Sequence, residues 1–144
     1  MAKSDADLPR AARALSLAAR ALERAAAVRD LTLAQFRILA LIAAGDERSS
    51  LLAERLAVAK PTITAVVDGL VERGFVAREA VAGDRRSIRV ALTPAGEVAL
   101  RAAEEEMSDT LGRIFGYAIH RDALVASLLE LDDALAARME ARLR

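Results

Sequence analysis

The chain contains no cysteine and no tryptophan, and it has one histidine, one tyrosine and three phenylalanines. Without cysteine it can form no disulfide, no thiolate metal site and no thiol-based redox sensor. His120 is interpreted as a helix-start or surface residue, because a metal site would need carboxylates such as Asp122 brought close to it. We therefore expect no metal and no cofactor.

Long apolar runs are also missing. No run approaches the roughly 20 residues of a membrane span, and no signal peptide pattern occurs at the N-terminus. A soluble, cytoplasmic protein without a membrane partner is therefore expected. No glycine-rich phosphate loop is present, and a nucleophile with a matching base is missing for want of cysteine and a second histidine, so an enzyme is not expected.

Aromatic residues make up 3% of the 144 residues, whereas hydrophobic residues make up 54%. The apolar mass is therefore Ala, Leu and Val, which favours helices over a sandwich or a barrel. The length suits a single domain with a real core. We predict a mainly α fold with a minor β component.

Acidic and basic residues balance, with 21 of each and a formal net charge of zero. Residues 1–30 carry six Lys or Arg against four Asp or Glu, residues 31–92 carry nine against seven, and residues 93–144 carry six against ten. This balance argues against a broad positive electrostatic field that would attract nucleic acid. Binding by the middle of the chain would depend on a few placed arginines and on helix N-termini.

Two short helices across a tight turn are predicted in the middle of the chain. The first covers residues 49–56, with a serine available as its N-cap. The second begins at Lys60, and its outward face is small and hydroxylated, so it can approach base edges and phosphates closely. Its apolar face consists of Ile63, Val66, Val67 and Leu70. The pair predicts a helix-turn-helix, although an ordinary amphipathic helix shows the same pattern.

A hairpin is predicted directly after these helices. Gly74 stands where a helix end favours a left-handed residue, and residues 75–79 and 88–92 read as strands. The segment between them carries Asp84, Arg85 and Arg86. This hairpin would be the wing of a winged helix-turn-helix.

In their order along the chain these segments resemble the MarR family of bacterial transcriptional regulators. The resemblance rests on residues 50–56, 60–64, 71–76, 84–86 and 92–96. It implies a winged helix-turn-helix that binds double-stranded DNA. It covers the middle of the chain, and helices of fitting length are predicted on both sides.

The resemblance also implies which residues contact DNA. Those expected to face the major groove are Lys60, Pro61, Thr62 and Thr64. Ser49 or Ser50, at the start of the preceding helix, is a candidate phosphate contact. Three departures weaken this detail: Ala57 stands where a glycine is frequent, Ala59 stands where a capping serine is frequent, and Gly69 lies within the second helix.

At the tip of the wing, Arg85 and Arg86 are long enough to enter a minor groove. Asp84 and Arg86 lie on one side of an extended segment, so the carboxylate can hold the guanidinium in position. The resemblance implies these same roles for Asp84 and Arg86. The alternative is a solvated charged turn.

Helical segments flank the winged part, which spans residues 31–93. Thr32 and Gln35 form a capping-box pattern, and Thr93 with Pro94 starts a long helix that breaks near Gly116. Residues 1–30 and 94–144 are predicted to form a helical dimerisation part, because apolar residues recur every three or four positions in its first and last helices. These positions are Leu8, Ala12, Leu15, Ala19, Leu22 and Ala26, and Leu124, Leu128, Leu131, Leu135, Met139 and Leu143. The first helix could instead pack only on its own domain.

Together these features predict a homodimeric, sequence-specific repressor that binds a pseudo-palindromic operator. The resemblance adds a small effector, aromatic or phenolic, bound in a crevice between the helical and winged parts. The alternative is a winged-helix module that binds a protein partner and not DNA; the zero net charge and Ala59 favour it, and Asp84 to Arg86 oppose it. The sequence does not identify the operator, the sign of regulation or the effector.

Overall fold

The computed structural model describes residues 2–45, 48–81 and 84–143, and its side chains are described for 6–45, 48–80 and 88–141. Six helices and a two-stranded antiparallel sheet make up this part of the chain. The elements in order are α1 (Ala2–Val28), α2 (Leu33–Ala43), α3 (Ser49–Leu56), α4 (Lys60–Glu72), β1 (Val76–Val81), β2 (Asp84–Leu92), α5 (Pro94–Phe115) and α6 (Arg121–Leu143). The mainly α fold with a small β component is confirmed.

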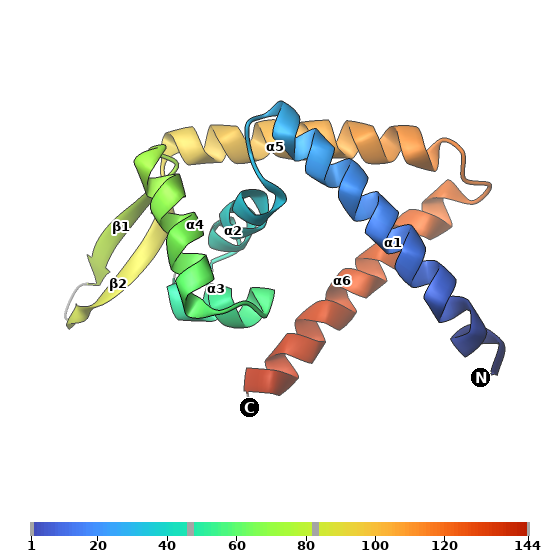
Figure 1. Ribbon diagram of the computed structural model, residues 1–144, viewed down its shortest axis with the longest axis horizontal. Coiled ribbons are helices and arrows are strands. Elements are labelled where there is room, and N and C mark those ends of the chain that lie inside the picture. Colours follow the sequence, from blue (N-terminus) through green and yellow to red (C-terminus); the bar gives the residue numbers. More distant parts are fainter. Residues whose placement is uncertain (1, 46–47, 82–83, 144) are drawn as a thin grey trace.

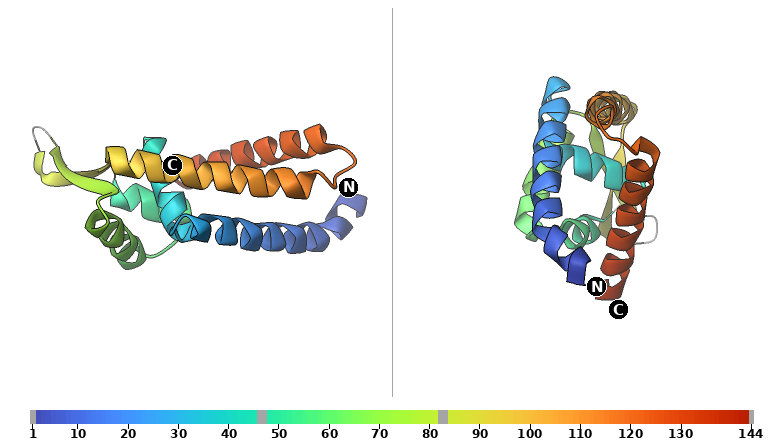
Figure 2. Two further views of the ribbon diagram at one scale, coloured as in Figure 1. Left: turned by 90° about the horizontal axis from the view of Figure 1, so that it is seen from above. Right: turned by 90° about the vertical axis from the view of Figure 1, so that its right-hand side faces the viewer.

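The long helix α5 connects two groups of elements (Figure 1). The sheet and the short helices α2, α3 and α4 gather at its N-terminal end, and α1 and α6 extend beneath its other end. Helices α1 and α6 overlap in Figure 1, but the end view in Figure 2 shows them along opposite sides of the molecule. The long helices α1, α5 and α6 therefore lie beside the winged part.

One hydrophobic core joins the winged part to the long helices. The predicted inward face of α4 is confirmed, since Ile63, Val67 and Leu70 are buried and Val66 packs against the same core. Leu39 of α2 and Leu100 of α5 also belong to it. Further buried members are Ala26, Leu31, Ile38, Leu52, Val76, Val90, Ala103 and Met107. The position of α4 is thus fixed by apolar packing on one side only.

Helices α1, α3 and α4 are each followed by a residue in the left-handed conformation. The residues after α1, α3 and α4 that take a left-handed conformation are Asp30 (φ 55°), Ala57 (φ 52°) and Gly74 (φ 72°). At the end of α4 the amide of Gly74 donates to Val71 O at 2.9 Å and the amide of Phe75 donates to Leu70 O at 2.9 Å. This pattern satisfies the last carbonyls of the helix. The predicted role of Gly74 is confirmed.

The starts of α2 and α5 follow the predicted caps. Thr32 Oγ1 accepts from the amide of Gln35, and Gln35 Oε1 accepts from the amide of Thr32 at 3.0 Å, which is the complete capping box. Thr93 Oγ1 accepts from the amide of Gly96 at 3.0 Å and donates to Gly74 O at 2.6 Å. Thr93 therefore caps α5 and ties it to the end of α4.

The first helix is longer than the sequence indicates. The spacing of its apolar residues predicts a helix from Leu8 to about Val28. Instead α1 runs from Ala2 with Pro9 inside it. The missing amide of Pro9 removes a single helical hydrogen bond near the N-terminus, and the alanine-rich sequence continues the helix on both sides.

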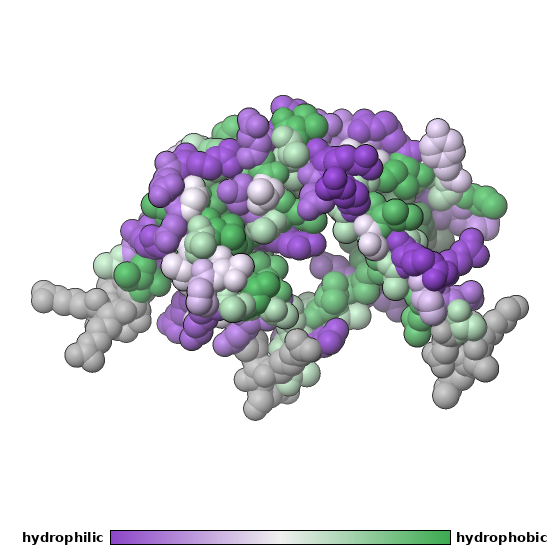
Figure 3. All heavy atoms as spheres, in the orientation of Figure 1, coloured by the Kyte–Doolittle hydropathy of each residue, from purple (hydrophilic) through white to green (hydrophobic). Residues whose placement is uncertain are grey.

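Much of α1 and α6 is exposed. Large apolar side chains with more than a third of their surface exposed include Leu8, Leu15, Leu124, Leu131 and Leu135. Figure 3 shows hydrophobic residues at the surface of the end formed by α1, α6 and the loop before α6. Leu22 and Ala26, the last two of the recurring apolar positions in α1, pack into the core of the chain itself. No helix in the described residues is long and apolar enough to cross a membrane.

Candidate nucleic-acid interface

Helices α3 and α4 meet across residues 57–59. Ala57 makes the left-handed turn, and the amide of Val58 then donates to Ala53 O at 3.1 Å. Ala59 is extended and occupies the N-cap position of α4 without a side-chain hydrogen bond. The departures noted at Ala57 and Ala59 thus fall on a strained turn and an uncapped helix start.

The N-cap of α3 differs from the prediction. The sequence indicates a serine cap, but Arg48 occupies that position with an extended backbone and no side-chain cap bond. Ser49 and Ser50 are instead the first two helical residues, with Ser49 half-buried and Ser50 exposed. Their amides lie in the first turn, where helix N-termini favour anions. Both serines remain candidates for phosphate contact.

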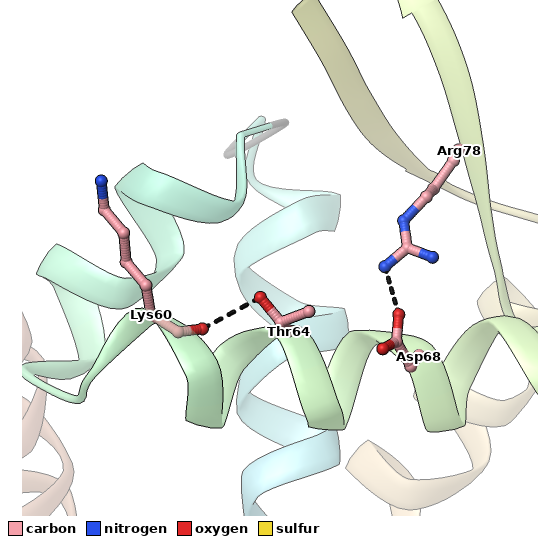
Figure 4. A network of polar contacts seen from close by, with 4 residues as sticks. All are labelled: Lys60, Thr64, Asp68 and Arg78. Carbon is pink, nitrogen blue, oxygen red and sulfur yellow. Dashed lines mark hydrogen bonds and ion pairs between the residues drawn. The ribbon is translucent and has the colours of Figure 1, made fainter.

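The outward face of α4 is exposed at its N-terminal half. Lys60, Pro61, Thr62 and Thr64 are all exposed. Lys60, Thr64 and Asp68 lie along one side of the helix (Figure 4), and Thr64 Oγ1 donates to Lys60 O at 3.0 Å. Because its hydroxyl proton is engaged, the Thr64 side chain presents oxygen lone pairs that suit a base amino group and a methyl group that suits a thymine methyl. All four predicted residues are thus accessible, and their contact with DNA stays a prediction.

Beyond this face, two acidic residues are neutralised by arginines. Arg78 of β1 donates from Nη2 to Asp68 Oδ1 (Figure 4), and Arg89 of β2 donates from Nε to Glu79 Oε2 at 2.9 Å. Surface pairs of this kind contribute about 0–1 kcal/mol to stability, so their effect is mainly on geometry and local charge. The Asp68–Arg78 pair joins α4 to the sheet. Sequence reasoning missed it, because the partners lie on different elements.

The wing is the predicted hairpin, with longer strands. Val76 pairs with Leu92 and Ala80 with Ile88, and the register is irregular between Ala80 and Val81. Asp84, Arg85 and Arg86 are the first residues of β2 and not, as expected, a separate segment between the strands; their side chains lie outside the described residues. The predicted contact of Asp84 with Arg86 stays a prediction.

Gly69 does not serve close packing. A Cβ at this position would have no neighbour within 4 Å. Close packing is therefore not the reason for a glycine at this position, and the residue only lowers the helical propensity of α4. The close approach lies at Gly96 instead, where a Cβ would overlap the backbone carbonyl of Phe75.

A crevice of about 380 Å³ lies between the winged part and α6. Phe36 and Leu41 of α2 and Leu135 and Met139 of α6 supply apolar walls. Its charged lining residues are Arg37, Arg55 and Asp132. The volume falls in the range of small-molecule sites. Among the described residues no group of three or more His, Asp or Glu could hold a metal ion.

A helix-turn-helix followed by a two-stranded hairpin, with the second helix exposing its polar face, defines the winged helix-turn-helix class of proteins. Residues 29–87 match the model of the MarR family. The HTH-type transcriptional regulator YpoP of Bacillus subtilis is 34% identical over 104 residues, which are 72% of this chain and 72% of that protein. The chain belongs to the MarR family and is a transcriptional regulator, not an enzyme.

Two further proteins illustrate the likeness. The HTH-type transcriptional repressor YetL of Bacillus subtilis is 42% identical over 82 residues, which are 55% of this chain and 49% of YetL. The transcriptional repressor CouR bound to a 23-mer DNA duplex is similar in structure, with a TM-score of 0.74, 28% identity and coverage of 87% of this chain and 89% of that chain. CouR from Rhodococcus jostii RHA1 bound to p-coumaroyl-CoA has a TM-score of 0.72 at 24% identity, over 87% of both chains.

Proposed function

We propose that the protein is a sequence-specific DNA-binding repressor that acts as a homodimer. The observation that carries this proposal is the exposed face of α4 at Lys60, Pro61, Thr62 and Thr64. Nothing bulky on this face holds the backbone away from a major groove, and the positive end of the helix dipole lies at this N-terminus. The repressor YetL and the DNA-bound repressor CouR support the same assignment.

The dimer is proposed to form through residues 1–30 and 94–144, leaving residues 31–93 as the DNA-binding part. Tyr117 and Ile119, in the loop before α6, are 93% and 92% exposed, and they continue the exposed apolar residues of α1 and α6. Contiguous apolar surface of this kind marks an interface. A symmetric dimer presents two α4 helices, which fits a pseudo-palindromic operator with half-sites about one helical turn apart.

Ser49 and Ser50 would contact phosphates beside the major groove. Arg85 and Arg86 would enter the adjacent minor groove, with Asp84 orienting Arg86. The neutralisation of Asp68 by Arg78 removes a charge that would otherwise repel phosphate near the reading face. A few directed contacts can then bind DNA although the net charge of the chain is zero.

We propose further that a small anionic aromatic or phenolic effector binds in the crevice between α2, α3 and α6 and releases the DNA. Arg37 and Arg55 supply positive charge, and Phe36, Leu135 and Met139 supply apolar surface for a ring. The p-coumaroyl-CoA complex of CouR supports a phenolic class of ligand. Because α6 lies in the proposed dimerisation part, a ligand there contacts both parts of the chain.

The test is fluorescence anisotropy on the DNA upstream of the gene and on scrambled DNA at several salt concentrations. Tight binding to the upstream DNA alone, weakening as salt rises, is expected. Arg86→Ala should lower specific affinity by about tenfold and reduce the salt slope, whereas Arg101→Ala on the exposed side of α5 should change neither. Equal weak binding to the upstream and scrambled DNA and to randomised DNA after selection would favour the alternative, a module that binds a protein partner.

A further inference from the structure

Arg73 joins the C-terminal end of α4 to the neighbouring helices α1 and α2. It is the first residue after α4, and its Nη1 donates to Asp30 O at 2.7 Å and to Gln35 Oε1 at 3.3 Å. Its guanidinium carbon lies 4.6 Å from the centre of the Phe75 ring. One side chain therefore contacts the end of α1, the start of α2 and the entry to β1.

Both acceptors are held by their own hydrogen bonds. Asp30 has a left-handed backbone (φ 55°), and the amides of Asp30 and Leu31 bond back to Ala27 O and Ala26 O at the end of α1. Gln35 Oε1 is fixed by the amide of Thr32 in the capping box. Arg73 thus binds two oxygens whose positions the helix ends determine.

The opposite side of the same turn is fixed as well, because Thr93 of α5 donates to Gly74 O at 2.6 Å. The C-terminal end of α4 is therefore anchored to α1 and α5, which the proposed function places in the dimer. The N-terminal end, at Lys60, has no side-chain cap and is the end that would read bases. Apolar packing of Ile63, Val67 and Leu70 holds the inner face of α4, and these polar contacts add an anchor at its C-terminal end.

The length of α4 determines how far a tilt at this anchor would move its other end. Thirteen residues span about 20 Å, so a tilt of about 5° at the anchored end would move Lys60 by about 1.7 Å. Hydrogen bonds to base edges tolerate only a few tenths of an ångström. In a two-fold dimer the same tilt occurs twice, and the distance between the two reading ends changes accordingly.

We propose that Arg73 is a positioning residue that sets the angle of α4 against the dimerisation helices and thereby the half-site spacing that the protein prefers. This inference rests on the proposed function. Arg73 contacts protein oxygens and not DNA, so its removal acts on spacing and leaves the number of phosphate contacts unchanged.

The test uses wild type, Arg73→Ala, Arg73→Lys and the charge-matched control Arg101→Ala on duplexes whose half-sites are one base pair closer, unchanged or one base pair farther apart. Arg73→Ala should bind the preferred duplex about tenfold more weakly, within the cost of one lost base contact. Its discrimination among spacings should shrink, with the salt slope unchanged. Arg73→Lys should recover most of the discrimination, because an ammonium can donate to the same two oxygens.

A second measurement does not depend on DNA. The chain has no cysteine, so Ala65→Cys on α4 and Ser108→Cys on α5, both exposed positions, can carry two spin labels whose distance distribution is measured after dilution with unlabelled protein. Arg73→Ala should broaden the distribution and Arg73→Lys should narrow it again. An unchanged distribution, an unchanged spacing profile or a reduced salt slope would overturn the inference. Failure of the wild type to prefer any duplex, with the label result intact, would instead overturn the proposed function.

Discussion

Replacing Gly96 by alanine tests the contact that joins the winged part to α5. Gly96 is buried in the first turn of α5, and a Cβ there would overlap the carbonyl oxygen and carbon of Phe75. That oxygen also accepts from the amide of Thr93 at 3.1 Å. Because both neighbours are backbone, no side-chain rotation can relieve the overlap, and α5 must move away from the turn after α4.

The size of the effect follows from three terms. Forcing an extra carbon into a packed site costs about 1–3 kcal/mol. Losing or stretching the Thr93 to Phe75 hydrogen bond costs about another 1 kcal/mol. The intrinsic preference of a helix for alanine over glycine returns up to about 1 kcal/mol. Gly96→Ala should therefore destabilise the protein by about 1–3 kcal/mol, which lowers Tm by about 3–10 °C for a chain of this size.

The control is Gly112→Ala in the same helix, where a Cβ would have no neighbour within 4 Å. It should stabilise by about 0.5–1 kcal/mol, because only helical propensity changes. Thermal and urea unfolding are followed by circular dichroism at one protein concentration, since dimerisation makes stability depend on concentration. Equal stabilisation by both substitutions would refute the close approach at Gly96.

Two further substitutions test the turn between α3 and α4. Ala57→Gly should stabilise by about 0.5–1 kcal/mol in urea unfolding, because the left-handed conformation at φ 52° costs alanine more than glycine; an unchanged or lower midpoint would contradict the assigned turn. Ala59→Ser should add about 1 kcal/mol by capping α4, since a hydroxyl there can accept from the amide of Thr62, the third helical residue. Ala65→Ser, exposed within the same helix, is its control, and equal effects of the two serines would show that no cap forms.

The elements that a local signal specifies could be predicted from the sequence. The capping box at Thr32, the cap at Thr93 and the left-handed Gly74 each depend on residues within three or four positions, and all three are confirmed. The inward face of α4 follows from its helical period. The order of these elements then indicated the winged helix.

Contacts between elements could not be predicted in this way. Arg73 bonds to Asp30, which is 43 positions away, and Arg78 pairs with Asp68 on a different element, so no periodicity marks either pair. The N-cap of α3 was missed because Ser49, Ser50 and Arg48 are adjacent, and the backbone at Arg48 decides which residue is the cap. Gly69 and Gly96 look alike in the sequence, and only the fold shows which one has a neighbour.

The zero net charge, which favours a protein partner in the sequence alone, carries less weight once the pairs are known. Charge counts treat Asp68 and Glu79 as repulsive to DNA wherever they lie. In the structure each is paired with an arginine, Arg78 and Arg89 respectively, so their fields largely cancel beyond a few ångströms. The side chain of Lys60, exposed at the start of α4, belongs to neither pair and lies where a phosphate or base edge would approach. The local arrangement of charge therefore supports DNA binding more strongly than the balance of the whole chain opposes it.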